Sequence, residues 1–178
     1  MTDSNRPSFG PLVWLAIPMA LAGCTVIPEL GELTDRGGTS GRRIVVNLSA
    51  QEAYLYHRGK LAAESPISSG REGKRTPTGR FQVIEKDIDH RSSLYGDFVR
   101  GGRVVKANVD ARTARRPSGS RFVGTSMPYF MRFSGAHGLH AGNLPGHPAS
   151  AGCIRLPYRQ ARRFYKAVRV GTPVTVLR

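Results

Sequence analysis

Cys153, in the stretch PASAGCIRLP at residues 148–157, is the side chain of this sequence best suited to covalent chemistry. The chain has two cysteines, and nothing near Cys153 could pair with it in a disulfide bond. A thiol attacks a carbonyl only as thiolate, and a free thiol with a pKa of about 8.5 is mostly protonated at neutral pH. His137 and His140 could each take the proton, whereas His147 is expected to be exposed in a loop.

The residues beside the cysteine are suited to acyl transfer. Attack on an amide carbonyl produces an oxyanion, which needs backbone N–H donors. The corner formed by Ala151, Gly152 and Cys153 offers such donors, because glycine lets the backbone approach closely. Arg155 shares a face with Cys153 if the segment is extended, so it could bind a substrate carboxylate with two hydrogen bonds. An ordinary surface arginine is the alternative.

A metal site fits this part of the sequence less well. His137, His140, His147 and Cys153 offer nitrogen and sulfur ligands, but their spacing resembles neither paired CxxC motifs nor HExxH. We therefore predict neither a metal nor a cofactor.

The N-terminal sequence predicts export and lipid attachment. The apolar run PLVWLAIPMALA at residues 11–22 is too short to span a membrane, which takes about 20 apolar residues, but it suits the core of a signal peptide. It leads into LAGC, ending at Cys24, which resembles the bacterial lipobox. This resemblance implies a signal peptide at residues 1–23, a lipid on Cys24 and a flexible tether at residues 24–41. A buried apolar helix is the alternative.

This reading makes Cys153 unusual for its compartment. With Cys24 carrying a lipid, Cys153 is the one free thiol of a protein in the bacterial cell envelope, facing the periplasm, where thiols usually form disulfides. Such a thiol is either buried and inert or retained for its reactivity. The 178 residues, 39% of them hydrophobic, can bury one ordinary core without a disulfide scaffold.

Hydrophobic patterning predicts a mainly β domain over residues 42–178 with one helix near its end, an α+β class. Strand-like patterns occur at residues 43–48, 52–57, 61–69, 80–85, 127–133, 138–140 and 174–177. Residues 86–121 are polar, glycine-rich and basic, which favours a long loop with a short hairpin. The helix is expected after Pro157, where apolar residues recur at helical spacing, and is expected to stop at Gly171.

Four segments together resemble the L,D-transpeptidase catalytic domain, also called the YkuD domain. They are SAGCIRLP, LHAG at residues 139–142, the strand pair IVVNLSAQEAYLYHRGK and the turn TPTG, and the resemblance runs in order from about Arg42 to the end. It implies a β-sandwich-like fold and a cysteine that is acylated by a peptidoglycan stem peptide. Because LHAG resembles the family's histidine motif, His140 rather than His137 is expected to be the base.

The same resemblance extends to residues around the nucleophile. We expect Ser150, Gly142 and Tyr129 to lie at the substrate, although aromatic residues at a strand start, such as Tyr129, more often belong to a core. Ala151 departs from the family pattern, which commonly has histidine at that position. The departure leaves His140 in place but removes one group that could stabilise the thiolate.

The strong positive charge bears on partners. The net charge is +15 and the sequence pI is about 11.0. Basic residues gather between Arg100 and Arg121, where the resemblance would place a lid, but no aromatic residues interleave them as a base-stacking platform, so we predict no nucleic-acid partner. Anionic lipid head groups, lipopolysaccharide or peptidoglycan carboxylates are better candidates, and a merely solvated loop is the alternative.

Together these features predict a monomeric, lipid-anchored L,D-transpeptidase. Cys153 would attack the L-to-D peptide bond of a tetrapeptide stem, and a stem amine, a protein lysine or a free D-amino acid would resolve the thioester. Resolution by water would make the same site an L,D-carboxypeptidase. The sequence leaves two further functions open: a wall-binding module without catalysis, which Ala151 favours, and a cysteine peptidase acting on ordinary proteins.

Overall fold

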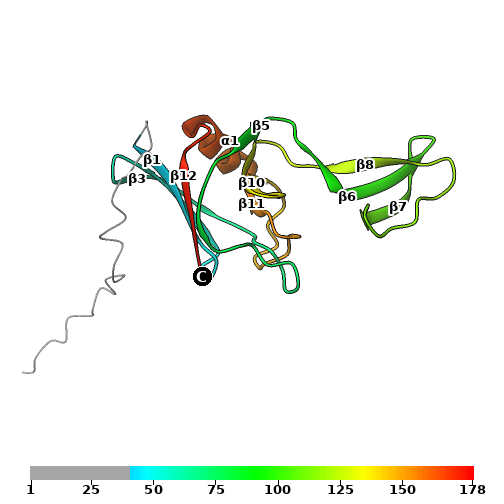
Figure 1. The fold of residues 1–178 in the computed structure, drawn as a ribbon, viewed down its shortest axis with the longest axis horizontal. Helices are drawn as coiled ribbons and strands as arrows, with labels where there is room; N and C mark the ends of the chain where they lie inside the picture. The colour runs from blue at the N-terminus through cyan, green and yellow to red at the C-terminus, as the bar shows by residue number, and fades with distance from the viewer. Residues whose placement is uncertain (1–40) are drawn as a thin grey trace, which may run out of the picture. The chain divides into compact units, whose positions relative to one another are not determined.

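The computed structural model describes residues 41–178, which contain three β-sheets and a helix (Figure 1). The predicted signal peptide, the lipidation site Cys24 and all but the last residue of the predicted tether lie outside the described residues. No helix within residues 41–178 has the length and apolar character needed to cross a bilayer.

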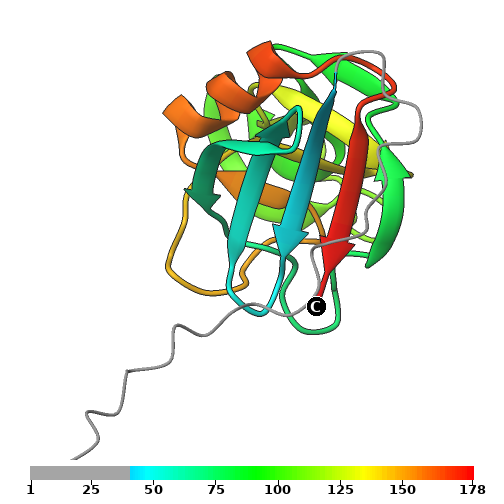
Figure 2. The same ribbon diagram turned by 90° about the vertical axis from the view of Figure 1, so that its left-hand side faces the viewer.

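The first sheet joins the two ends of the described chain. Its strand order is β3-β2-β1-β12-β4, and its strands are β1 (Arg42–Asn47), β2 (Glu52–His57), β3 (Lys60–Pro66), β4 (Gly79–Gln82) and β12 (Pro173–Leu177). The first and last strands, β1 and β12, pair in parallel, with Ile44 opposite Val174. Figure 2 shows these two strands side by side across the face of the sheet.

The second sheet carries the residues with chemical potential. Its order is β11-β10-β9-β5, and its strands are β5 (Glu85–Asp87), β9 (Phe130–Ser134), β10 (His137–Ala141) and β11 (Ile154–Leu156). Strands β10 and β11 run parallel, which sets His140 beside Arg155. The pairing of β10 with β9 is irregular at His137 and Gly138, so the start of β10 departs from regular pleating.

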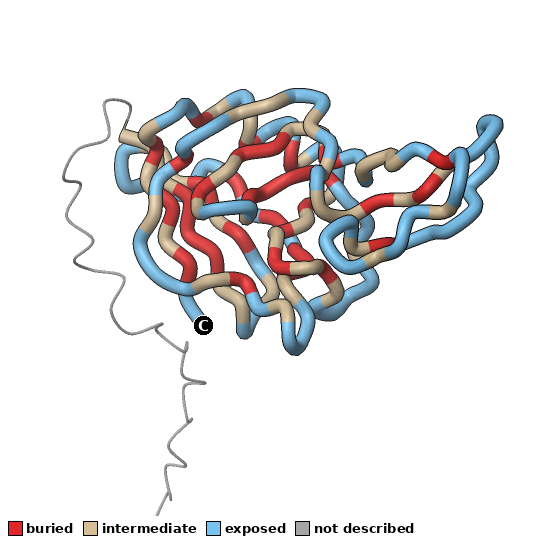
Figure 3. The backbone as a smooth tube through the Cα atoms, turned by 45° about the vertical axis from the view of Figure 1, so that its right-hand side comes forward, coloured by how far each residue is buried: buried red, intermediate tan, exposed pale blue. Residues whose placement is uncertain are grey.

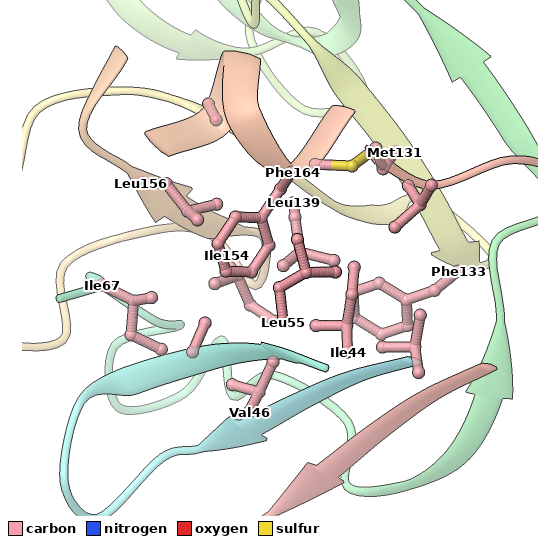
Figure 4. Packing of buried hydrophobic residues seen from close by; sticks show 14 of the residues in the cluster. Ile44, Val46, Leu55, Ile67, Met131, Phe133, Leu139, Ile154, Leu156 and Phe164 are labelled. Carbon is pink, nitrogen blue, oxygen red and sulfur yellow. The ribbon is translucent and has the colours of Figure 1, made fainter. Parts of the chain in front are cut away.

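The core lies between these two sheets and is closed by the helix α1 (Tyr158–Ala167). Figure 4 shows Ile44 and Val46 of β1 facing Leu139 and Ile154 of the second sheet, with Phe164 of α1 among them. The alternating burial in β2 and β12 turns one face of each strand toward this core, whereas β1 has three consecutive buried residues, Ile44, Val45 and Val46. The predicted β-sandwich-like, mainly β fold with one late helix is confirmed for residues 41–178.

The third sheet differs from the prediction. Residues 86–121, expected to be mostly loop, contain long strands, and the sheet order is β7-β6-β8 with β6 (Arg91–Arg100), β7 (Arg103–Asp110) and β8 (Arg121–Ser126). Figures 1 and 3 show this sheet extending from the two central sheets as an arm, with few buried segments. Residues 103–108 of β7 are exposed on both faces, so the sequence has no apolar alternation there to indicate a strand.

Candidate active site

Cys153 directly precedes β11, at the end of the segment that returns from β10. It is half-buried, and its Sγ lies 3.5 Å from the carbonyl oxygen of Ala136, to which the thiol donates. Burial raises the pKa of the Cys153 thiol, while the Gly138 backbone and the cations Arg132 and Arg155 act in the opposite direction. Burial prevails, so the resting side chain is a neutral thiol.

The corner before the cysteine depends on Gly152. Its φ of +119° lies in a region that side chains rarely adopt, and a Cβ added there would lie 2.7 Å from Nε2 of His137. The Gly152 N–H donates to Oγ of Ser150 at 3.0 Å, and that hydroxyl in turn donates to the carbonyl oxygen of Cys153. Because the Gly152 N–H is already used, the N–H groups of Ala151 and Cys153 are the remaining candidates for oxyanion donors.

A loop from the other central sheet braces this corner. The buried Thr76 donates from its Oγ1 to the carbonyl oxygen of Gly152 at 2.8 Å and accepts the Gly70 N–H at 2.9 Å. The Arg71 N–H donates to the carbonyl oxygen of Ser150 at 3.0 Å. Residues 70–76 therefore hold the peptide groups on the N-terminal side of Cys153 in place. The TPTG motif of the sequence contributes through its first threonine.

His140 is buried in β10, with 6% of its surface exposed. Its Nδ1 donates to the carbonyl oxygen of Ala141 at 2.8 Å, which leaves Nε2 unprotonated and able to accept a proton. Burial lowers the pKa of His140 from 6.5 to about 4, a shift that the Ala141 carbonyl opposes and that the neighbouring Arg155 and His90 increase. At neutral pH the ring is an uncharged base.

His137 is a second imidazole near Cys153. Its Nδ1 lies 3.2 Å from the carbonyl oxygen of Ser134, to which the protonated nitrogen donates, and its Nε2 lies against the backbone of Gly152. It lines the same cavity as Cys153 and His140. Both histidines that the sequence left open as bases are thus present at the site, from the two ends of one short strand.

Arg155 extends into the same cavity from β11. A Cβ at Gly142 would come within 3.0 Å of the Cγ of Arg155, so the missing side chain at 142 leaves space for the arginine stem. Arg155 has no acidic partner among the ion pairs of residues 41–178. Its guanidinium is therefore free to bind an anionic ligand.

The cavity has a volume of about 600 Å³ and a wall rich in cations. Six cationic side chains line it, and no aspartate or glutamate does: Arg71, Lys74, Arg75, Arg112, Arg132 and Arg155. Glu85 pairs with Arg132 at 2.6 Å and Asp110 pairs with Arg112 at 2.6 Å. The loop REGKR at residues 71–75 was not predicted to be part of the site. Its three basic residues were the sequence feature that could have indicated it.

The arm contributes one wall of this cavity. Tyr95 of β6 accepts hydrogen bonds at its hydroxyl from Lys74 at 3.3 Å and from Arg112 at 3.0 Å. Asp110, at the end of β7, lies 3.9 Å from Lys74, and hydrogen bonds from Arg112 hold the pKa of Asp110 at about 2. This set of four residues ties the 70–76 loop to the arm across the cavity.

Two residues predicted to contact substrate have other surroundings. Tyr129 does not line the cavity. It packs against Tyr158 and Tyr165 of α1, with ring centroids at 5.2 and 5.6 Å. Ser150 lies at the cavity wall, but its buried hydroxyl is occupied within the corner, an arrangement that suits bracing better than recognition. Within residues 41–178, no three His, Cys, Asp or Glu side chains are grouped so as to hold a metal ion.

Comparisons with known proteins agree with this geometry. The sequence model of the L,D-transpeptidase catalytic domain, YkuD, matches residues 41–176. A protein of Bacillus licheniformis described as L,D-transpeptidase YkuD is 25% identical over 134 residues, which cover 75% of this chain and 64% of that protein. The chain thus spans somewhat less than two thirds of this relative.

Solved structures show the same fold. The L,D-transpeptidase from Mycobacterium smegmatis superposes with a TM-score of 0.59 at 20% identity, covering 78% of this chain and 59% of that one. A cysteine-to-serine mutant of the Enterococcus faecium L,D-transpeptidase gives 0.56 at 25% identity, covering 77% and 50%. The family match over residues 41–176, with the shared fold, confirms the resemblance seen in the sequence: the chain belongs to the L,D-transpeptidase catalytic domain (YkuD) family.

Proposed function

We propose that this protein is a cysteine-dependent L,D-transpeptidase acting on peptidoglycan stem peptides. One observation carries the proposal. A single cavity is lined by Cys153, His140 and Arg155, the Nε2 of His140 is unprotonated, and the cavity wall has six cations and no carboxylate. The cysteine-to-serine mutant made in the Enterococcus faecium relative is consistent with a cysteine of special importance in the family.

The first half-reaction acylates the cysteine. Cys153 transfers its proton to Nε2 of His140 as its sulfur bonds to the carbonyl carbon of the L-to-D peptide bond. The resulting oxyanion is stabilised by the Ala151 and Cys153 N–H groups. When the C–N bond breaks, the imidazolium returns the proton to the leaving D-residue amine, and the tripeptide stays as a thioester.

The second half-reaction releases the enzyme. An acceptor amine attacks the thioester and forms an amide, the sulfur leaves as thiolate, and the amine's proton returns to the thiolate through His140. Because the pKa of His140 is about 4, its imidazolium form exists only briefly during each proton transfer. Cys153 and His140 therefore do not form a thiolate–imidazolium pair in the resting enzyme. Water in place of the amine would give the L,D-carboxypeptidase outcome.

The charge of the cavity matches the proposed substrate. Peptidoglycan stems carry free carboxylates, and the guanidinium of Arg155 can bind one in bidentate fashion close to the reacting bond. Arg71 and Arg75 offer further cations along the wall, and neither has an acidic partner within residues 41–178. We place the enzyme in the bacterial envelope, anchored through lipid on Cys24, which remains a proposal from the sequence.

Intact-mass spectrometry tests the proposal directly. The chain without residues 1–24 is mixed with a tetrapeptide-stem muropeptide, alongside Cys153→Ala, His140→Ala and the control His147→Ala, which changes an exposed histidine outside the cavity. The expected result is a tripeptide adduct and release of the D-residue in the wild type and the control, with no adduct in Cys153→Ala.

The products then distinguish a transferase from a hydrolase. A high ratio of cross-linked dimer to free tripeptide identifies a transferase, and the reverse identifies a hydrolase. If neither adduct nor product forms although the stem binds, the enzyme proposal fails and the wall-binding module replaces it.

A further inference from the structure

The helix α1 has two contrasting faces. Ala161 and Phe164 are fully buried in the core, while the opposite face is exposed and entirely cationic. Its exposed cations recur three and four residues apart, which places them along one side of the helix; they are Arg159, Arg162, Arg163 and Lys166, hereafter the cationic stripe.

This stripe works against the stability of its own helix. Like charges three and four residues apart repel each other, and Arg159 lies in the first turn, where the helix dipole disfavours a positive charge. The first turn has no acidic residue, and no Asp or Glu follows Asp110 in the chain. None of the four cations forms an ion pair within residues 41–178. Within residues 41–178, Arg163 donates to the Ala62 carbonyl oxygen and Lys166 lies in the last turn, where the dipole favours it, but no carboxylate offsets the repulsion among the four cations. Such uncompensated repulsion points to an external anionic partner.

The surroundings of the stripe favour a lipid surface over a soluble anionic polymer as the partner. Tyr158 and Val170, near the two ends of the helix, are each 58% exposed, so apolar surface accompanies the charge. A tyrosine and an aliphatic side chain beside cations suit the head-group layer of a bilayer, on which α1 would rest with its charged face because its apolar face is occupied by the core. A soluble anionic polymer would be bound by the cations alone and gives no reason for the exposed apolar groups.

A groove beside the stripe is suited to a single head group. It measures about 520 Å³ and is lined by Pro66, Pro157, Gln160 and two arginines of the stripe, Arg159 and Arg163. The Oε1 of Gln160 is buried and has no hydrogen-bond partner within residues 41–178. A buried acceptor without a donor is unfavourable. A ligand that offers a phosphate to the guanidiniums and a hydroxyl to this oxygen would satisfy both.

We propose that the cationic stripe, Tyr158, Val170 and this groove form a docking surface for an anionic phospholipid bilayer, with the head group of phosphatidylglycerol as ligand of the groove. The phosphate binds between Arg159 and Arg163, and a glycerol hydroxyl donates to Oε1 of Gln160. The surface lies outside the cavity of Cys153 and acts independently of the chemistry there.

Vesicle co-sedimentation tests this surface. The chain without residues 1–24 is used, because the whole hydrophobic cluster falls within residues 44–176 and the apolar N-terminal run, which could bind lipid by itself, is absent. Vesicles of phosphatidylcholine alone are compared with vesicles that also contain phosphatidylglycerol. Each cation near an anionic bilayer favours binding about fivefold, so changing all four stripe residues to Gln is expected to weaken partitioning into the anionic vesicles ~600-fold.

A matched variant controls for net charge. Replacing Arg58, Lys60, Arg80 and Arg178 with Gln removes the same three arginines and one lysine from exposed, scattered positions of the first sheet and its turns, outside both the groove and the cavity. This variant is expected to lose much less than the stripe variant. Because Arg163 also donates to the carbonyl oxygen of Ala62 at 2.6 Å, a triple variant that retains Arg163 is included, with the melting temperature of each protein.

Three results would overturn the proposal. These are equal losses in the stripe variant and the charge-matched control variant, binding that does not distinguish the two vesicle types, and a stripe variant that binds vesicles normally but no longer binds isolated anionic wall polymer. Gln160→Leu adds a readout for the groove. It is expected to reduce the preference for phosphatidylglycerol over phosphatidic acid, which has no glycerol hydroxyls, while leaving muropeptide turnover unchanged.

Discussion

Oγ1 of Thr76 donates a hydrogen bond to the carbonyl oxygen of Gly152 at 2.8 Å, across a sequence separation of 76 residues. Through this bond a turn attached to the first sheet fixes the peptide group that joins Gly152 to Cys153. The bond is buried, so its loss is not replaced by water. The position of Cys153 therefore depends on a residue from the other half of the sandwich.

Thr76→Val keeps the shape of the side chain but removes its hydroxyl. The Gly152 carbonyl and the Gly70 N–H lose their partner, which is expected to lower the free energy of unfolding by about 2 kcal/mol and kcat/KM about tenfold. Urea unfolding and muropeptide turnover measure the two effects. Thr78→Val, at an exposed position of the same turn, is the control, and equal losses in both variants would argue against the specific role of Thr76.

Cys153 is expected to react with alkylating reagents at the slow rate of a neutral thiol. Because burial raises the pKa of Cys153 and lowers that of His140, no thiolate–imidazolium pair forms at rest. Alkylation by iodoacetamide is expected to be slower at neutral pH than that of free cysteine and to keep increasing with pH above 9. In the chain without residues 1–24, Cys153 is the sole cysteine, so mass spectrometry reads it directly. A rate plateau near neutrality would instead reveal a standing ion pair.

His140 makes stability depend on pH in a defined direction. Its pKa is about 4 in the folded protein and 6.5 when unperturbed, so between these values the unfolded chain binds the extra proton and the folded chain does not. Stability is therefore full above pH 6.5 and falls as the pH decreases toward 4, by about 3 kcal/mol in total. Urea titrations across this range are expected to show the slope in the wild type and His147→Gln, but not in His140→Gln.

The two histidines are expected to differ in catalytic weight. His140→Gln removes the proposed base and is expected to lower kcat by a factor of about 10²–10⁴. His137→Gln changes a ring that lies against Gly152, and it is expected to lower kcat about tenfold because it disturbs the corner that positions Cys153. Single-turnover acylation with both variants gives the comparison. If His137→Gln lowers the acylation rate more than His140→Gln does, His137 rather than His140 is the base.

Arg155 is expected to act on substrate binding through the substrate's carboxylate. Arg155→Gln is expected to lower kcat/KM 10- to 100-fold, as charged hydrogen bonds contribute about 1.5–3 kcal/mol, mainly through KM. With the wild type, amidating the bound carboxylate of the stem peptide is expected to lower kcat/KM by the same factor. With Arg155→Gln, the same amidation is expected to cause no further decrease in kcat/KM. Arg80→Gln, an exposed arginine of β4 outside the cavity, serves as control.

The sequence predicted what is encoded locally. β1, β2 and β12 are apolar or alternating segments, and the helix after Pro157 has buried Ala161 and Phe164 at helical spacing, so each is recognisable from its own residues. The three-residue strands β5 and β11 are too short for such a pattern, and the sequence did not predict them. Cys153, His140 and Arg155 were identified because the motifs around them are short and contiguous. The structure places all three in one cavity.

What the sequence missed depends on contacts between distant segments. The sequence predicts only a short hairpin in a long loop at residues 86–121, because residues 103–108 of β7 are stabilised by pairing with β6 and not by an apolar face. The Tyr95 hydroxyl accepts hydrogen bonds from Lys74 and Arg112, which belong to separate segments. Nothing in the local sequence of these residues links them. Tyr129 was expected at the substrate, but its neighbours are tyrosines of a helix that begins 29 residues later.

The parallel pairing of β1 with β12 has a consequence for how the chain acquires its structure. In the first sheet β12 lies between β1 and β4, so that sheet stays divided until the final strand arrives. Pairs so distant in sequence form slowly, because a long loop must close first. During synthesis the first sheet therefore stays incomplete until β12 has been made, so the closing of this sheet is a late event in the formation of the domain.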